Sequence, residues 1–177
     1  MNREQLEHAI RAACDVSGDN ELYIFGSQAI LGQFPEAPEE LRQSIEVDLS
    51  PKNKPESVDK IDGALGENSQ FHLTHGYYVH GVLLDTAALP EGWEERTNKV
   101  QDYMDDNNIG WSVEAHDLAA SKLIAFREKD RTFVRRLLLE GMIDAGKLVK
   151  RIQSIDTEKE LKERALRWTK RMLDELR

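Results

Sequence analysis

The segment Leu22–Pro51 constrains the fold more than any other part of the chain. It opens with four apolar residues, a pattern typical of a short buried strand, and this strand ends at the pair Gly26-Ser27. Apolar residues then recur at helical spacing until two nearby prolines end the pattern. After a polar insert, residues 44–49 alternate between polar and apolar side chains, which predicts a second strand.

The second strand carries two carboxylates on one face, because side chains two positions apart on a strand point the same way. Glu46 and Asp48 would repel each other unless a cation lay between them, and oxygen ligands of this kind suit Mg²⁺. The alternative is a solvent-exposed acidic face, with Ile45, Val47 and Leu49 buried on the other side.

The pair Gly26-Ser27 also has two interpretations. A glycine after a buried strand lets the backbone approach a ligand closely, and the N-terminus of the following helix offers free N–H groups to a phosphate. Ser27 would otherwise be a simple N-cap of that helix.

Composition limits the class of protein. The chain has 177 residues, 40% of them hydrophobic, and a single cysteine, Cys14, which fits a reducing cytoplasm. No run of 18 apolar residues predicts a membrane span, and no apolar leader opens the sequence. Residues 1–117 hold 8 Lys and Arg against 23 Asp and Glu, whereas residues 118–177 hold 16 against 10. The net charge of −9 argues against a general nucleic-acid binder, but the basic C-terminal part would suit an anionic substrate.

Periodicity predicts an α+β fold: a half with both strands and helices over residues 1–114, followed by a helical region over 115–177, and the resemblance described below implies that the strands form a small mixed sheet. Besides the strands described above, we expect strands at 71–74, 77–84 and 109–113, and 96–104 is ambiguous between strand and helix. Helices are expected at 2–15, 27–34, 55–66, 115–128, 130–139, 145–152 and 157–176.

Three stretches together resemble a known family. Arg42–Leu49 (Arg-Gln-Ser-Ile-Glu-Val-Asp-Leu), with the upstream strand and Gly-Ser turn, looks like the nucleotidyltransferase superfamily that includes DNA polymerase β. More narrowly, it resembles the Arg-x-Ser/Thr-x-Asp-apolar-Asp-apolar signature of AbiE-type toxin nucleotidyltransferases. Asp117–Asp130 is similar to the helical Lys…Arg…Asp motif of these toxins, and Leu89–Arg96 resembles their uncharacterised bacterial relatives.

The resemblance implies a polymerase-β-like core and a Mg²⁺-dependent transfer of a nucleotidyl group from a nucleoside triphosphate to an acceptor hydroxyl. The acceptor would be the 3′ end of a tRNA or a protein, and a cognate antitoxin would be a partner. By resemblance, the chain's site residues are Gly26 and Ser27 for the phosphates, Glu46 and Asp48 for Mg²⁺, Lys122 and Arg127 for the nucleotide, and Asp130 to complete the helical motif.

The chain departs from the signature in two ways. Glu46 stands where the signature has Asp, and the insert lengthens the gap between Ser27 and the acids. A third carboxylate is not evident, and Asp85 is the one candidate. These departures leave open a catalytically weakened module of the same fold that binds a nucleotide or a partner.

Other interpretations remain. Lys122 could extend to the surface from an apolar helix face, and Asp130 could merely cap the next helix and pair with Arg127. A third possibility is a helical interaction protein that docks a partner through Leu161, Trp168 and Met172.

Three histidines lie close together in the sequence, His72, His75 and His80. Imidazole is a good zinc ligand, but on a regular strand the first two would point to opposite faces, and no cysteine supports them. The interpretation as structural or surface residues is preferred, with His75 facing a nucleotide pocket if a bulge turns it inward.

Overall fold

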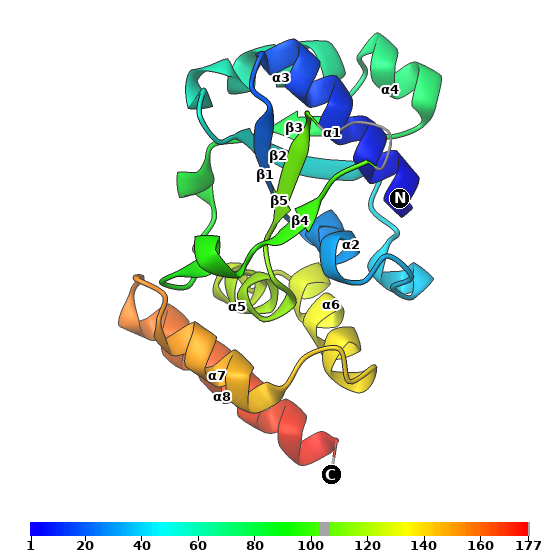
Figure 1. Cartoon of the computed structure of the whole chain (residues 1–177). Helices are drawn as coiled ribbons and strands as arrows, with labels where there is room; N and C mark the ends of the chain where they lie inside the picture. The colour runs from blue at the N-terminus through cyan, green and yellow to red at the C-terminus, as the bar shows by residue number, and fades with distance from the viewer. Residues whose placement is uncertain (103–106, 177) are drawn as a thin grey trace. The chain divides into compact units, whose positions relative to one another are not determined.

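The computed structural model describes residues 1–102 and 107–176 (Figure 1). The chain divides into two compact units. The first comprises Met1–Thr86 and Thr97–Val113, and the second comprises Ala87–Arg96 and the chain from Glu114 onward. The two units are described separately below.

A five-stranded mixed sheet forms the centre of the first unit, in the order β3-β2-β1-β5-β4. β1 runs antiparallel to β2 and parallel to β5, while β2 is parallel to β3 and β4 is antiparallel to β5. The strands are β1 (Glu21–Phe25), β2 (Glu46–Pro51), β3 (Tyr78–Gly81), β4 (Asn98–Val100) and β5 (Ile109–Ser112).

The first unit also contains four α-helices among its described residues. They are α1 (Arg3–Ser17), α2 (Ile30–Gln33), α3 (Val58–Leu65) and α4 (Gln70–His75). α1 and α3 lie side by side (Figure 1). A Cβ on Gly110 of β5 would meet Ile10 of α1, one on Gly81 of β3 would meet Ile61 of α3, and one on Gly32 of α2 would meet Ser112 of β5. Because these strand positions share a face through the strand register, α1, α2 and α3 lie on the same side.

The second unit is helical. Its helices are α5 (Ala115–Ala125), α6 (Glu128–Leu139), α7 (Ala145–Gln153) and α8 (Lys159–Glu175). The segment Ala87–Arg96 joins them through Arg96, whose Nε donates to Oδ2 of the fully buried Asp117 over 2.8 Å. Nε of Arg151 lies 2.9 Å from the other oxygen of the same carboxylate, so that two cations compensate one buried charge.

The expected α+β class is confirmed, with a mixed sheet and eight α-helices among the described residues. No helix in the described part of the chain is long and apolar enough to cross a membrane. Trp168 and Met172 are buried, which removes them from the docking face that the α8 stripe would have formed.

The predicted strand at 71–74 is wrong, because these residues belong to helix α4. Oγ of Ser69 accepts a hydrogen bond from the backbone N–H of His72, and Gly76 closes the helix in the left-handed conformation with φ of +76°. A helix of six residues is too short for its periodicity to stand out, so the cap residues carried the relevant signal.

Several boundaries also differ. The strand expected at 77–84 is limited to β3, and the ambiguous segment 96–104 contains β4, with 103–106 outside the described residues. The helix expected at 115–128 ends earlier, because Phe126 turns the backbone left-handed at φ of +61°. The next helix therefore begins at Glu128 with Arg127 as its N-cap residue, and Asp130 caps it from the first turn by accepting a hydrogen bond from the backbone N–H of Arg127.

Candidate active site

β2 presents its two carboxylates on the sheet face opposite α1 and α3. Val47 and Leu49 are fully buried, whereas the side chains of Glu46 and Asp48 are 38% and 22% exposed. The expected alternation is therefore present in this strand. Ile45 is an exception, since it lies just before the strand and is 48% exposed instead of buried.

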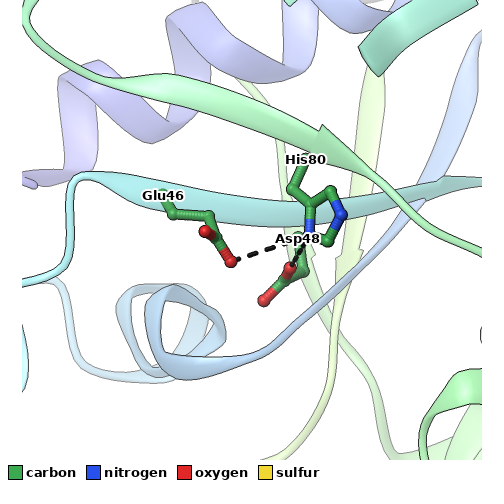
Figure 2. A group of neighbouring side chains, drawn as sticks. All are labelled: Glu46, Asp48 and His80. Carbon is green, nitrogen blue, oxygen red and sulfur yellow. Dashed lines mark hydrogen bonds and ion pairs between the residues drawn. The ribbon is translucent and has the colours of Figure 1, made fainter. Parts of the chain in front are cut away.

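His80 joins the two carboxylates from the neighbouring strand. Parallel pairing sets His80 of β3 beside Asp48, and Nδ1 of the imidazole lies 3.0 Å from Oδ1 of Asp48 and 3.6 Å from Oε1 of Glu46 (Figure 2). One ligand atom from each of the three residues lies within 4.8 Å of the others. Within residues 1–102 and 107–176, no other group of three His, Cys, Asp or Glu side chains approaches this closely.

Gly26 brings the backbone of the turn after β1 against this cluster. The antiparallel register pairs Phe25 with Asp48, so the next residue lies beside the carboxylate. Gly26 has φ of +69°, and a Cβ placed on it would lie only 1.9 Å from Oδ2 of Asp48. Glycine is therefore required here by both conformation and space, and the expected close approach of the backbone is directed at an acidic side chain.

The turn that follows is fixed from β5. Ser27 begins a short 3₁₀ turn, Ser27–Ala29, that leads into α2, so Ser27 is not the cap residue that was expected. Oγ of Ser112 donates to the carbonyl of Ala29 over 2.6 Å, which holds the end of the turn. Gln28 is fully buried, and neither side-chain amide atom has a hydrogen-bond partner among the described residues. Buried polar groups without partners are costly, and they concentrate at functional positions.

Electrostatics make the cluster favourable for a cation. Burial and the nearby charge of Glu46 raise the pKa of Asp48 to about 6, although the hydrogen bond and charge of His80 act in the opposite direction. The hydroxyl of Tyr78 donates to Oε2 of Glu46 over 2.6 Å, and this hydrogen bond raises the pKa of Tyr78. The phenol therefore remains a donor, and it fixes which oxygen of Glu46 faces His80.

The residues present fit a divalent cation. Two carboxylates and one imidazole are metal-ligand types, and they come from adjacent strands of one sheet, which are rigid supports. Because Gly26 has no Cβ, Oδ2 of Asp48 lies against the backbone of the turn. Mg²⁺, the expected ion, accepts the two carboxylates readily but prefers oxygen to imidazole nitrogen.

The other expected site residues lie in the second unit and form a buried ion-pair network. Nζ of Lys122 lies 3.3 Å from Oδ1 of Asp130 and 4.6 Å from the ring centre of Phe133. Nε of Arg127 donates to Oδ2 of Asp130 over 2.7 Å, and the backbone N–H of Arg127 donates to the same oxygen over 3.2 Å. Burial disfavours the charge on Asp130, but the hydrogen bond from Arg127 and the charge of Lys122 lower its pKa. Lys122 is buried and does not extend to the surface, whereas the side chain of Arg127 is 61% exposed.

Two hydrogen-bond partners of the carboxylates were missed from the sequence. His80 and Tyr78 come together with Asp48 and Glu46 because β2 and β3 are parallel and in register. The sequence indicated part of this arrangement. Glu46 and Asp48 are two residues apart, as are Tyr78 and His80, and a strand was expected at each pair. The register between them was not available. Asp85, the suggested third carboxylate, is exposed in a 3₁₀ turn after β3 and does not join the cluster.

The neighbouring histidines are also separate from the cluster. The ring centre of His72 lies 4.9 Å from that of Tyr78, and His75 lies 4.7 Å from both His8 and Phe71. Since His72 and His75 lie on α4, the argument from strand alternation did not apply to them.

Comparison with known proteins gives one match. A family model described as "Nucleotidyltransferase of unknown function (DUF6036)" matches residues 4–174. No curated protein and no solved structure matches the chain. The matched range includes the Glu46–Asp48–His80 cluster and the Lys122–Asp130 pair.

Proposed function

We propose, from the premise that the chain belongs to the DUF6036 family of nucleotidyltransferases of unknown function, that it transfers a nucleotidyl group from a nucleoside triphosphate to an acceptor hydroxyl in a metal-dependent reaction. One observation carries this proposal above the others. Glu46 and Asp48 share a face of β2 beside the turn at Gly26, where the backbone approaches Asp48 closely. Acidic pairs beside a glycine turn suit a cation that itself binds phosphate oxygens.

The proposed reaction requires little covalent assistance from the protein. The acceptor oxygen attacks the α-phosphorus, the bond between that phosphorus and the bridging oxygen to the β-phosphate breaks, pyrophosphate leaves, and the hydroxyl proton passes to solvent. A bound divalent ion would neutralise the charge on the phosphate oxygens and on the attacking and leaving oxygens. Glu46 and Asp48 would hold the ion in place, and the turn Gly26–Ser27 would position the phosphates.

The roles of the second-unit residues stay predictions. Lys122 and Arg127 are expected to contact the nucleotide, and Asp130 is expected to orient both cations, which agrees with its hydrogen bonds to them. The acceptor, whether a tRNA 3′ end or a protein, and the antitoxin partner follow from the resemblance to AbiE-type toxins alone. We also keep the proposed division into a core over 1–114 and a helical region over 115–177.

The test is transfer of label from each α-labelled nucleoside triphosphate to bulk tRNA and to protein, with a divalent ion present. Asp48→Asn is expected to abolish transfer, because it removes a charged ligand while preserving shape. The matched control is Asp59→Asn, which changes an exposed carboxylate on α3 in the same unit. Full transfer by Asp48→Asn would contradict the proposal.

A second candidate is a catalytically weakened module that binds a nucleotide or a partner. It is favoured by His80, because the contact of 3.0 Å between its Nδ1 and Oδ1 of Asp48 gives the acidic pair a partner other than a metal. Thermal shift with each nucleoside triphosphate, with and without a divalent ion, separates the candidates. Stabilisation that requires the ion supports the enzyme, and ion-independent stabilisation by a nucleotide supports the binding module.

A further inference from the structure

The candidate cation site has three protein donors of two chemical kinds. Glu46 and Asp48 supply carboxylate oxygens from β2, and His80 supplies Nδ1 from β3 (Figure 2). His80 occupies the register position opposite Asp48, so its place is set by the pairing of the edge strand β3 with its neighbour β2. The position of the imidazole beside Asp48 is therefore fixed by the strand pairing.

The spacing of the donors agrees with a shared ion. For metal–ligand bonds of about 2.1 Å, two ligands lie about 3.0 Å apart in an octahedral site and about 3.4 Å apart in a tetrahedral one. Nδ1 of His80 lies 3.0 Å from Oδ1 of Asp48 and 3.6 Å from Oε1 of Glu46. These two distances bracket the tetrahedral value and include the octahedral one, and the three ligand atoms all lie within 4.8 Å of one another.

Neighbouring groups fix the orientation of the ligands. Tyr78 donates to Oε2 of Glu46, which leaves Oε1 toward His80. This hydrogen bond orients the side chain of Glu46. Hydrogen-bond partners of metal ligands usually have this effect. Gly26, which has no Cβ, admits Oδ2 of Asp48 against the backbone of the turn.

We propose that His80 is the third protein ligand of this ion, and that the site consequently prefers a divalent transition metal such as Mn²⁺ to Mg²⁺. This inference rests on the proposed function, because it concerns the same cation. Mg²⁺ favours oxygen ligands, whereas first-row transition ions accept imidazole nitrogen. Mn²⁺ also accepts carboxylate and phosphate oxygens, so it suits both the protein donors and a nucleoside triphosphate.

The proposal gives His80 the position that a third carboxylate would otherwise take. Asp85 lies outside the cluster, and the described residues offer no further acid to it. Replacing His80 by Asp should therefore convert the donor set to three carboxylates and reduce the preference for Mn²⁺ over Mg²⁺.

The test measures metal binding by the full chain without nucleotide. Free Mn²⁺ is followed by electron paramagnetic resonance, and Mg²⁺ is added as competitor. Mn²⁺ is expected to bind more tightly than Mg²⁺ to the wild-type chain, and pulsed spectra should show coupling to a nitrogen nucleus. In His80→Ala the Mn²⁺ affinity should fall by about 10-fold or more, the Mg²⁺ affinity should change less, and the nitrogen coupling should disappear.

His75→Ala is the matched control, because His75 is an exposed histidine of the same unit outside the cluster. It should leave both affinities unchanged. His80→Asp should still bind Mn²⁺ without nitrogen coupling and with a smaller advantage over Mg²⁺, which also separates loss of the imidazole from loss of the fold.

The outcomes distinguish this inference from the proposed function. An unchanged Mn²⁺-to-Mg²⁺ ratio and an unchanged nitrogen signal in His80→Ala would overturn the inference, even if Asp48→Asn still abolished transfer. Mn²⁺ binding through His80, together with full transfer by Asp48→Asn, would support the inference and refute the proposed function. Failure of the wild-type chain to bind either ion would overturn the inference.

Discussion

Gly26→Ala should destabilise the first unit through two separable effects. The backbone at this position has φ of +69° and ψ of −171°, a region that is essentially restricted to glycine and costs other residues about 1–3 kcal/mol. The added Cβ would also lie 1.9 Å from Oδ2 of Asp48, where an ordinary contact begins at 3.4 Å. The carboxylate must then move by about 1.5 Å, away from its contact with His80.

We expect a total loss of about 2–5 kcal/mol in the free energy of unfolding, a large part of the stability of a typical domain. The assay is urea unfolding of the metal-free protein. Repeating the measurement in an Asp48→Ala background removes the steric clash, because the remaining Cβ of residue 48 would lie 3.4 Å from the new methyl group. The difference between the two backgrounds is the steric contribution. The cost of Gly26→Ala should fall there by about 1–2 kcal/mol, leaving the backbone strain.

Gly76→Ala is the control for positive φ without a steric clash. Gly76 has φ of +76°, and nothing lies within 4 Å of the position of its Cβ. It should cost about 1–2 kcal/mol, with no dependence on the residue at position 48. A coupling of less than about 0.5 kcal/mol between Gly26→Ala and Asp48→Ala would refute the steric reasoning.

Two further predictions concern charge. Because the pKa of Asp48 is raised to about 6 in the folded, metal-free protein, the folded state retains a proton that the unfolded chain loses, and stability should fall as pH rises from about 4 to 6. Urea unfolding across this pH range should show that the free energy of unfolding depends less on pH in Asp48→Asn than in the wild-type protein. An equal dependence in the two proteins would contradict the raised pKa of Asp48. In the second unit, Asp130→Asn should cost about 3 kcal/mol in the free energy of unfolding, since Lys122 and Arg127 both lose their pairing with a fully buried carboxylate. Lys122→Met should cost less, because Asp130 retains Arg127, and the reverse order of stabilities would contradict this account.

Local patterns predicted much of the fold because they report burial. The alternation in 46–49 gave the correct face for both carboxylates, since a strand with one buried face has no other way to place its apolar residues. The helices of the second unit were also expected close to their observed positions, as their apolar stripes are long. The main error, at 71–74, fell on a short helix where the cap at Ser69 outweighed β propensity.

Local sequence patterns predicted only part of the candidate site. Glu46 and Asp48 are neighbours in the sequence, but His80 and Tyr78 reach them across 32 residues through the pairing of β2 with β3. Strand order and register depend on the packing of the whole sheet, which a single sequence does not reveal. Of the three histidines considered from the sequence, His80 alone lies beside the two carboxylates, while His72 and His75 lie on α4.

The glutamate at position 46 and the missing third carboxylate become connected in the structure. A glutamate in place of aspartate lengthens the first ligand by one bond, and Tyr78 of β3 holds that longer side chain through a hydrogen bond of 2.6 Å. Two residues further along the same strand, His80 stands beside Asp48, where no third carboxylate is found among the described residues. One strand thus both positions the unusual acid and supplies the additional donor. Glu46, Tyr78 and His80 therefore act together. Glu46→Asp alone should not increase the affinity for Mg²⁺ relative to Mn²⁺, because the shorter side chain would lose its hydrogen bond from Tyr78 while the imidazole of His80 would remain as a donor.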